Sequence, residues 1–222
     1  MPSTIESILD AALDKALAVQ RPAVLAYLDR TREKAPEATP AEVVEQLERR
    51  YFAAVVGIGA AAGAAAAAPG AGTAASLASG AGEITAFVTA TGMFVLALAE
   101  LHAIPVSDPE VRRALLVSVL LGESAAAALE VAEGETRHWA QLLGRSMAKD
   151  RLSNINSRMG HLLLKRFGAK QGALLLGRAL PLGIGAGIGA VGNAALARTA
   201  ITASHRAFGD APAVFPARVI DV

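Results

Sequence analysis

Apolar positions recur at three- and four-residue steps along almost the whole chain, which is the spacing of one face of an α-helix. After residue 40, this spacing joins a polar segment to the apolar tract AAVVGIGAAAGAAAAA, so one helix is expected to run through both, with its apolar face at Val43, Val44, Leu47, Tyr51 and Val55. Strand signals are poor, because β-branched alternation is short and no Asn-Gly or Asp-Gly turn separates two such runs. The pattern therefore predicts an all-α protein.

Helix start signals divide this pattern into elements. Ser3 and Glu6 form one capping box, Thr39 and Glu42 form a second that has proline at the first helical position, and Asp108 precedes another such proline. We expect a compact Ala/Gly-rich multi-helix bundle of about eight or nine helices, with a hydrophobic helical hairpin as an open alternative for the apolar segments. The expected helices span residues 4–19, 22–34, 41–67, 73–102, 109–133, 135–149, 151–167, 170–178 and 182–208.

Glycine is concentrated in the uncharged run between Arg178 and Arg198, which holds nineteen residues and five glycines. Glycine is costly in a water-exposed helix, so this density favours helices whose backbones approach closely. Gly59 and Gly63 form a second small-xxx-small pair in the first apolar tract. Because that tract is extremely rich in alanine, this spacing could also arise by chance. The candidate helix-packing residues are Gly59, Gly63, Gly183, Gly185, Gly187 and Gly189.

The same glycines superficially resemble a dinucleotide-binding loop. That loop needs a preceding β-strand and a ribose-binding acid about twenty residues later. A helix is expected before Gly57, and Pro181 opens the second run, so neither glycine cluster fits. The sequence indicates no nucleotide cofactor.

Membrane insertion is left open by hydropathy. Residues 84–99 are uncharged, but sixteen helical residues reach only about 24 Å against a hydrocarbon core of ~30 Å. The run from residue 179 to 197 is long enough but rich in glycine, and the run from 51 to 82 contains almost nothing but alanine and glycine. A soluble or peripheral bundle and an inserted protein both remain as interpretations.

Charge is divided unevenly along the chain, although its formal net value is only +1. Residues 1–50 carry seven basic and nine acidic groups, residues 51–140 carry three and eight, and residues 141–222 carry eleven and three. A cationic last third favours an anionic partner surface. Without a recognition-helix pattern or stacking aromatics, lipid headgroups or an acidic protein face suit it better than nucleic acid.

A cationic amphipathic helix is expected over residues 151–167. Its apolar stripe faces one way, and three basic residues seven positions apart line a neighbouring face with His161. It is a candidate for lying on an anionic membrane; the alternative is an ordinary bundle helix with a solvated basic face. The candidate membrane or partner contacts are Arg145, Lys149, Arg151, Arg158, Lys165, Arg166, Lys170 and Arg178.

Signals for catalysis are thin. The four histidines fall on different expected helices or helix ends, and no glycine-flanked serine elbow or His-Glu-x-x-His motif occurs. Glu135 and His138 have the Glu-x-x-His spacing of di-metal helical bundles, to which Glu83, Glu100, Glu123 and Glu130 would add carboxylates. The second copy of that motif is missing, so exposed helix carboxylates explain these acids better. No cysteine, cofactor motif or signal peptide is seen.

Several blocks, in order, resemble the EcsC-like bacterial proteins. They are PGAGTAASLASGAGEITAF, then VLALAELHAIPVSDPEVRRALLVSVLLGE, a basic linker, and LPLGIGAGIGAVGNAALARTAITASHRAFG, together covering roughly residues 45–210. The resemblance implies a helical, hydrophobic protein of the cell interior or membrane, related to one encoded beside an ATP-driven exporter. The apolar helix starts with Glu83 where the family suggests aspartate, and the resemblance carries over no catalytic residue.

Together these observations predict N-terminal amphipathic helices in residues 1–38, an EcsC-like helical domain in 39–210 and a tail in 211–222. The expected function is that of a non-enzymatic accessory protein in the cytoplasm, peripheral to or inserted in the inner membrane. It would bind anionic lipid or a membrane protein with an acidic face. Two alternatives stay open: a self-assembling homo-oligomer held by the glycine faces, and a metal-dependent helical enzyme.

Overall fold

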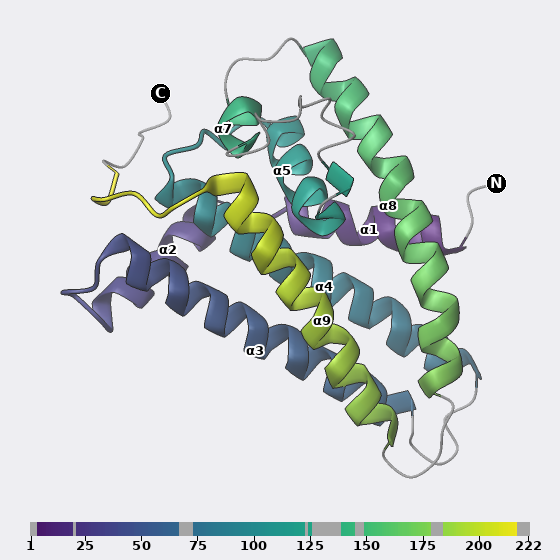
Figure 1. Cartoon of the computed structure of the whole chain (residues 1–222). Helices are drawn as coiled ribbons and strands as arrows, with labels where there is room; N and C mark the ends of the chain where they lie inside the picture. Colours follow the sequence, from purple (N-terminus) through teal and green to yellow (C-terminus); the bar gives the residue numbers. More distant parts are fainter. Residues whose placement is uncertain are drawn as a thin grey trace.

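The computed structural model describes residues 4–19, 21–66, 73–122, 124–125, 139–144, 149–178 and 184–216, and side chains within 6–65, 80–125, 139–143, 150–165 and 189–216 apart from residues 20 and 123 (Figure 1). All regular elements in these ranges are helices, which confirms the all-α prediction. They are α1 (Thr4–Leu17), α2 (Arg21–Glu33), α3 (Pro40–Ala66), α4 (Thr73–Leu101), α5 (Pro109–Leu121), α7 (Trp139–Gly144), α8 (Lys149–Arg178) and α9 (Ile184–Phe208).

Two of the expected helix starts are confirmed in atomic detail. At α3 the Thr39 amide donates to the Glu42 carboxylate over 2.7 Å, and the Glu42 amide donates back to Thr39 Oγ1 over 3.3 Å. The Thr39 amide, and with it the Thr39 hydroxyl, which donates to the same carboxylate over 3.0 Å, hold the pKa of Glu42 below its ordinary value. At α5, Asp108 Oδ1 accepts from the Glu110 amide over 2.8 Å. The capping box at Ser3 lies outside the described residues.

The core is built around α4, whose C-terminal half is buried almost without interruption from Phe94 to Leu101 apart from Glu100. Helices α1, α2, α3 and α5 pack against α4, and the most extensive helix contact of all joins α3 to α9 (Figure 1). Small residues set these distances: a Cβ on Gly92 of α4 would lie 3.1 Å from the Ala16 Cβ of α1. Alanine and glycine thus replace large side chains with close helix approach.

The helix expected over 109–133 is interrupted at Gly122, while residues 123 and 126–133 lie outside the described residues. Helix α5 ends at Leu121, because Gly122 takes a φ of 60° and its amide bonds back to the carbonyls of Ser118 and Val119. Glycine adopts this positive φ readily because it has no Cβ, and the chain leaves the helix there.

The expected break at residues 168–169 is also wrong, because α8 runs unbroken through Lys149–Arg178. A single Gly168 costs a helix only about 1 kcal/mol, and no proline is present in this segment to force an end. The prediction had also placed Lys149 at the end of the preceding helix, whereas Lys149 begins α8.

Candidate functional site

Helix α8 presents basic side chains to solvent. Arg151, Arg158 and Lys165 are all exposed and follow one another at seven-residue steps, with His161 exposed on the same helix. Seven helical residues rise about 10 Å, so the three cations form a line rather than a cluster. The whole helix contains seven basic residues and one acid, Asp150.

The opposite side of α8 is already occupied. Leu152, Met159 and Leu163 are at most 2% exposed and belong to the core, where α8 packs chiefly on α5. Asn156 locks this contact, because its Nδ2 donates to the Glu110 carbonyl over 3.1 Å and to its carboxylate over 2.6 Å. The described part of the apolar stripe therefore cannot enter a membrane unless α8 leaves α5, whereas Arg151, Arg158 and Lys165 are exposed.

Some predicted contact residues fall where the structure gives less detail. Arg145 lies outside the described residues, as do Gly183 and the candidate metal ligands Glu135 and His138. Side chains are not described for Lys149, Arg166, Lys170 and Arg178, which the structure places on α8. Gly185 and Gly187 lie in the first turns of α9.

The glycines of α3 and α9 meet within one chain. A Cβ built on Gly59 would lie 2.4 Å from the carbonyl oxygen of Gly189, and one built on Gly189 would lie 2.2 Å from the carbonyl oxygen of Gly59 and 3.5 Å from the Gly63 Cα. Real Cβ atoms do not come so close, so the two backbones touch at a point that only glycine permits. These three glycines are used inside the fold, which leaves them no part in a subunit contact.

Asn193 fixes the same crossing, a role that the sequence analysis did not predict. Its side chain is buried, at 3% exposed, and its Nδ2 donates to the Val55 carbonyl over 3.1 Å. A buried polar side chain with a backbone partner makes the helix register specific. The signal available in the sequence was its position as the single amide in an otherwise apolar run.

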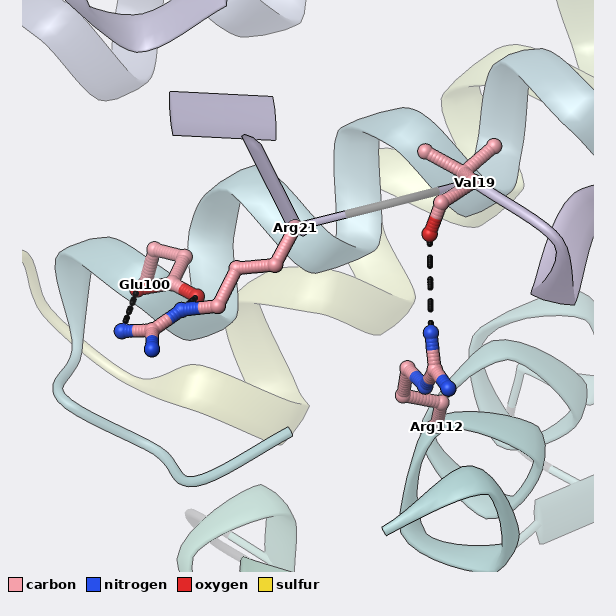
Figure 2. A network of polar contacts seen from close by, with 4 residues as sticks. All are labelled: Val19, Arg21, Glu100 and Arg112. Atoms are coloured by element: carbon pink, nitrogen blue, oxygen red, sulfur yellow. Dashed lines mark hydrogen bonds and ion pairs between the residues drawn. The ribbon is translucent and has the colours of Figure 1, made fainter. Parts of the chain in front are cut away.

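Of the carboxylates considered for metal binding, Glu123 and Glu130 lie outside the described residues, Glu83 is buried on α4, and Glu100 has a basic partner. Glu100 forms an ion pair with Arg21, with Nε–Oε1 and Nη2–Oε2 distances of 2.5 and 3.0 Å (Figure 2). Nearby, the Arg112 guanidinium donates to the carbonyls of Leu17 and Val19 at the end of α1. In the described portions of the chain, no three His, Asp or Glu side chains gather as a metal site. Arg21 and Arg112 thus tie the N-terminal helices to α4 and α5.

An open depression of about 440 Å³ lies at the end of α2, lined by Asp29, Arg32, Glu33 and Pro36. Its wall is shaped by the tail, since the Arg32 guanidinium stacks 4.1 Å from the centre of the Phe215 ring. The lining includes acidic and basic side chains, but it holds no nucleophilic side chain next to a base. We assign it no reaction.

One segment of the described helices could cross a membrane by length and hydropathy alone, residues Gly80–Leu101 of α4. Two thirds of it (67%) is buried inside the fold, which is what a soluble core helix also shows. The segment is therefore weak evidence for a membrane-spanning helix, because it also forms part of the buried core of the bundle.

Charge reappears where α3 and α9 leave their uncharged segments. The Arg198 guanidinium lies over the Phe52 ring at 5.5 Å, and about two turns further along α9 His205 pairs with Glu48 of α3 at 3.0 Å. Burial raises the pKa of Glu48, and the charge of His205 acts against that rise.

We expect His205→Ala to raise the pKa of Glu48 further, because burial would then act without the opposing imidazolium. A carboxyl whose folded-state pKa is raised stabilises the fold below its unfolded pKa of about 4.5 and loses that contribution as pH rises through the folded value. Stability should therefore fall more steeply with rising pH in His205→Ala. Carbon-13 NMR titration of the Glu48 carboxyl measures the shift, and His161→Ala on α8 should leave it unchanged.

No family model, curated protein or solved structure matches this chain. The EcsC-like resemblance accordingly stays a prediction based on the order of the sequence blocks.

Proposed function

We propose that this protein is a non-enzymatic accessory protein of the EcsC-like type that binds the anionic surface of the inner membrane through the basic side of α8. The observation that supports the proposal most directly is the division of α8: its apolar side is buried on α5, while Arg151, Arg158 and Lys165 are exposed. A long helix with six more basic than acidic residues, held rigidly at the edge of the bundle, presents a fixed array of positive charge.

Electrostatics sets the expected strength. A basic residue close to an anionic membrane surface contributes about 1 kcal/mol, and the contribution disappears within roughly a Debye length. Three described cations, joined by the other basic residues of α8, are enough for measurable and salt-sensitive binding. The apolar stripe is not required to leave the core.

Flotation with vesicles tests this proposal. The protein should float with phosphatidylcholine vesicles that contain phosphatidylglycerol at low salt, and much less at high salt. Reversing all three charges in Arg151→Glu, Arg158→Glu and Lys165→Glu together should weaken binding by roughly 100-fold, since three favourable contributions are lost.

The matched control reverses three exposed charges elsewhere, Lys15→Glu, Arg30→Glu and Lys34→Glu, and so changes the net charge equally. It should keep most of the binding. Equal losses in both triple variants would reduce the effect to net charge and remove α8 as the contact. Equal binding to vesicles of phosphatidylcholine alone would contradict an electrostatic contact, whereas no binding to the anionic vesicles at low salt would leave an acidic protein partner as the better explanation.

A further inference from the structure

Two histidines attach the C-terminal end of α9 to other helices. His205, in the last turn of α9, pairs through Nε2 with the Glu48 carboxylate of α3 at 3.0 Å. His102, directly after the last residue of α4, packs its ring on the ring of Phe208, with the two ring centres 5.3 Å apart. Phe208 ends α9 and is buried. These two contacts are called the histidine clasp below.

Both ring nitrogens of His102 contact carbonyl oxygens. Nδ1 lies 2.8 Å from the Leu98 oxygen, one turn back on α4, and Nε2 lies 3.3 Å from the Asp210 oxygen, just after α9. A neutral imidazole carries one N–H, so one of its nitrogens would turn a lone pair towards a carbonyl oxygen. The imidazolium carries two N–H groups and donates to both oxygens. Protonation therefore completes the attachment of His102 to the chain that follows α9.

Both histidines also lie at the C-terminal end of a helix. The last carbonyl groups of a helix give this end a partial negative charge, which favours a cation there. His102 meets that charge at the end of α4 through the Leu98 carbonyl, and His205 lies within the last turn of α9. A cation at such a position shifts the equilibrium towards the intact helix end by a factor of about two to five.

The anion that His205 meets is partly withdrawn from water. The Glu48 side chain is only 17% exposed, so its pair with an imidazolium is screened less than a pair on the open surface. The cation Arg206 is next to His205 in the sequence, but successive residues of a helix do not face each other. The other charged groups described near the clasp are the ion pairs Glu45–Arg49 and Glu100–Arg21, and Asp210 after α9.

We infer that the histidine clasp is a pH-sensitive attachment: protonation of His102 and His205 tightens the end of α9 against α4 and α3, and deprotonation loosens it. Histidine is the side chain that ordinarily changes charge between about pH 5 and 8. Because both contacts favour the protonated rings, their stabilisation is full at acidic pH and is lost as pH rises through this range. The tail responds with the helix, since it leads from the clasp to Phe215, whose ring lies 4.1 Å from the Arg32 guanidinium of α2.

Amide hydrogen exchange on the full chain tests this inference. Protection factors, which correct for the pH dependence of intrinsic exchange, are compared at pH 6 and pH 8, above the ordinary titration range of carboxyl groups. In the last two turns of α9, residues 202–208, protection should be roughly fivefold higher at pH 6, because two helix-end cations are then present.

Glutamine variants assign the effect to the two rings. His102→Gln combined with His205→Gln keeps an amide that can form hydrogen bonds at each position and removes the titrating group. This double variant should retain the helical circular dichroism spectrum and show the same protection at both pH values. The matched control is His161→Gln, which removes an exposed histidine of α8 and should keep the full difference.

Equal protection of the unchanged protein at pH 6 and pH 8 would overturn the inference without any variant. It would also be overturned if the double variant kept the full difference, because another group would then set the pH dependence. The measurement contains no lipid, so its outcome is independent of the proposed binding of α8 to a membrane.

Discussion

Gly189→Ala should lower the free energy of unfolding by about 3 kcal/mol or more, at the upper end of the range for overpacked interiors. The new Cβ would lie 2.2 Å from the Gly59 oxygen and 3.0 Å from its carbonyl carbon. Both are backbone atoms, so no side chain can rotate to make room, and α3 and α9 must move apart. That movement also stretches the 3.1 Å hydrogen bond from Asn193 to Val55. Urea unfolding followed by circular dichroism measures the loss.

Gly57→Ala is the matched control, since it changes the same residue type on α3 two positions from Gly59, the residue that Gly189 contacts. A Cβ at Gly57 meets nothing within 4 Å. Alanine is the better helix former, so the variant should be more stable by roughly 0.5–1 kcal/mol. If Gly189→Ala matched Gly57→Ala instead, the two backbones could not lie as close as the structure places them.

The position of this crossing was only partly readable from sequence. Glycine spacing indicated that α3 and α9 carry close-packing faces, but spacing on one helix does not say which residue of another helix it meets. The chance interpretation seemed adequate for Gly59, yet Gly59 is the residue that contacts Gly189. Which residues of α3 meet which residues of α9 depends on how far the two helices are shifted along each other. The hydrogen bond from Asn193 to Val55 helps to fix that shift, and no local sequence pattern encodes it.

Helix boundaries were predictable where side chains act locally. Two helix starts are set by local contacts and are present in the structure. Thr39 and Glu42 bond to each other at the start of α3, and Asp108 accepts a backbone hydrogen bond at the start of α5, next to Pro109. The glycines were harder: Gly122 ends α5, whereas Gly168 lies within α8. Both are glycines, so intrinsic helix propensity does not tell which of them ends a helix.

The basic helix shows the same limit for the candidate site. Its amphipathic pattern was visible in the sequence, but a membrane and a neighbouring helix satisfy an apolar stripe equally well. The structure assigns the described stripe of Leu152, Ile155, Met159 and Leu163 to the core beside α5. The contact between Arg198 and Phe52 was missed, because these residues lie 146 positions apart and become neighbours only when α3 and α9 pack.

Arg21→Met should destabilise the protein by about 2 kcal/mol. Its ion pair with Glu100 is bidentate, and the side chains are only 24% and 11% exposed, so removing the arginine leaves the carboxylate poorly hydrated and without this partner (Figure 2). Breaking a fully buried pair costs about 3–5 kcal/mol, and the residual exposure of Arg21 reduces that figure. The expected consequence is a weaker attachment of α2 to the end of α4, measured by urea unfolding and by faster amide exchange in α2.

Two further variants separate the ion pair from the loss of a long side chain. Arg21→Met combined with Glu100→Leu removes both charges and should recover much of the stability, because apolar replacement of a whole buried pair is often nearly neutral. Arg49→Met breaks the pair with Glu45, whose side chains are 61% and 63% exposed, and should change stability by no more than about 0.5 kcal/mol. If the double variant is no more stable than Arg21→Met, the arginine acts through its packing on α4, and the stranded charge of Glu100 is not the cause of the loss.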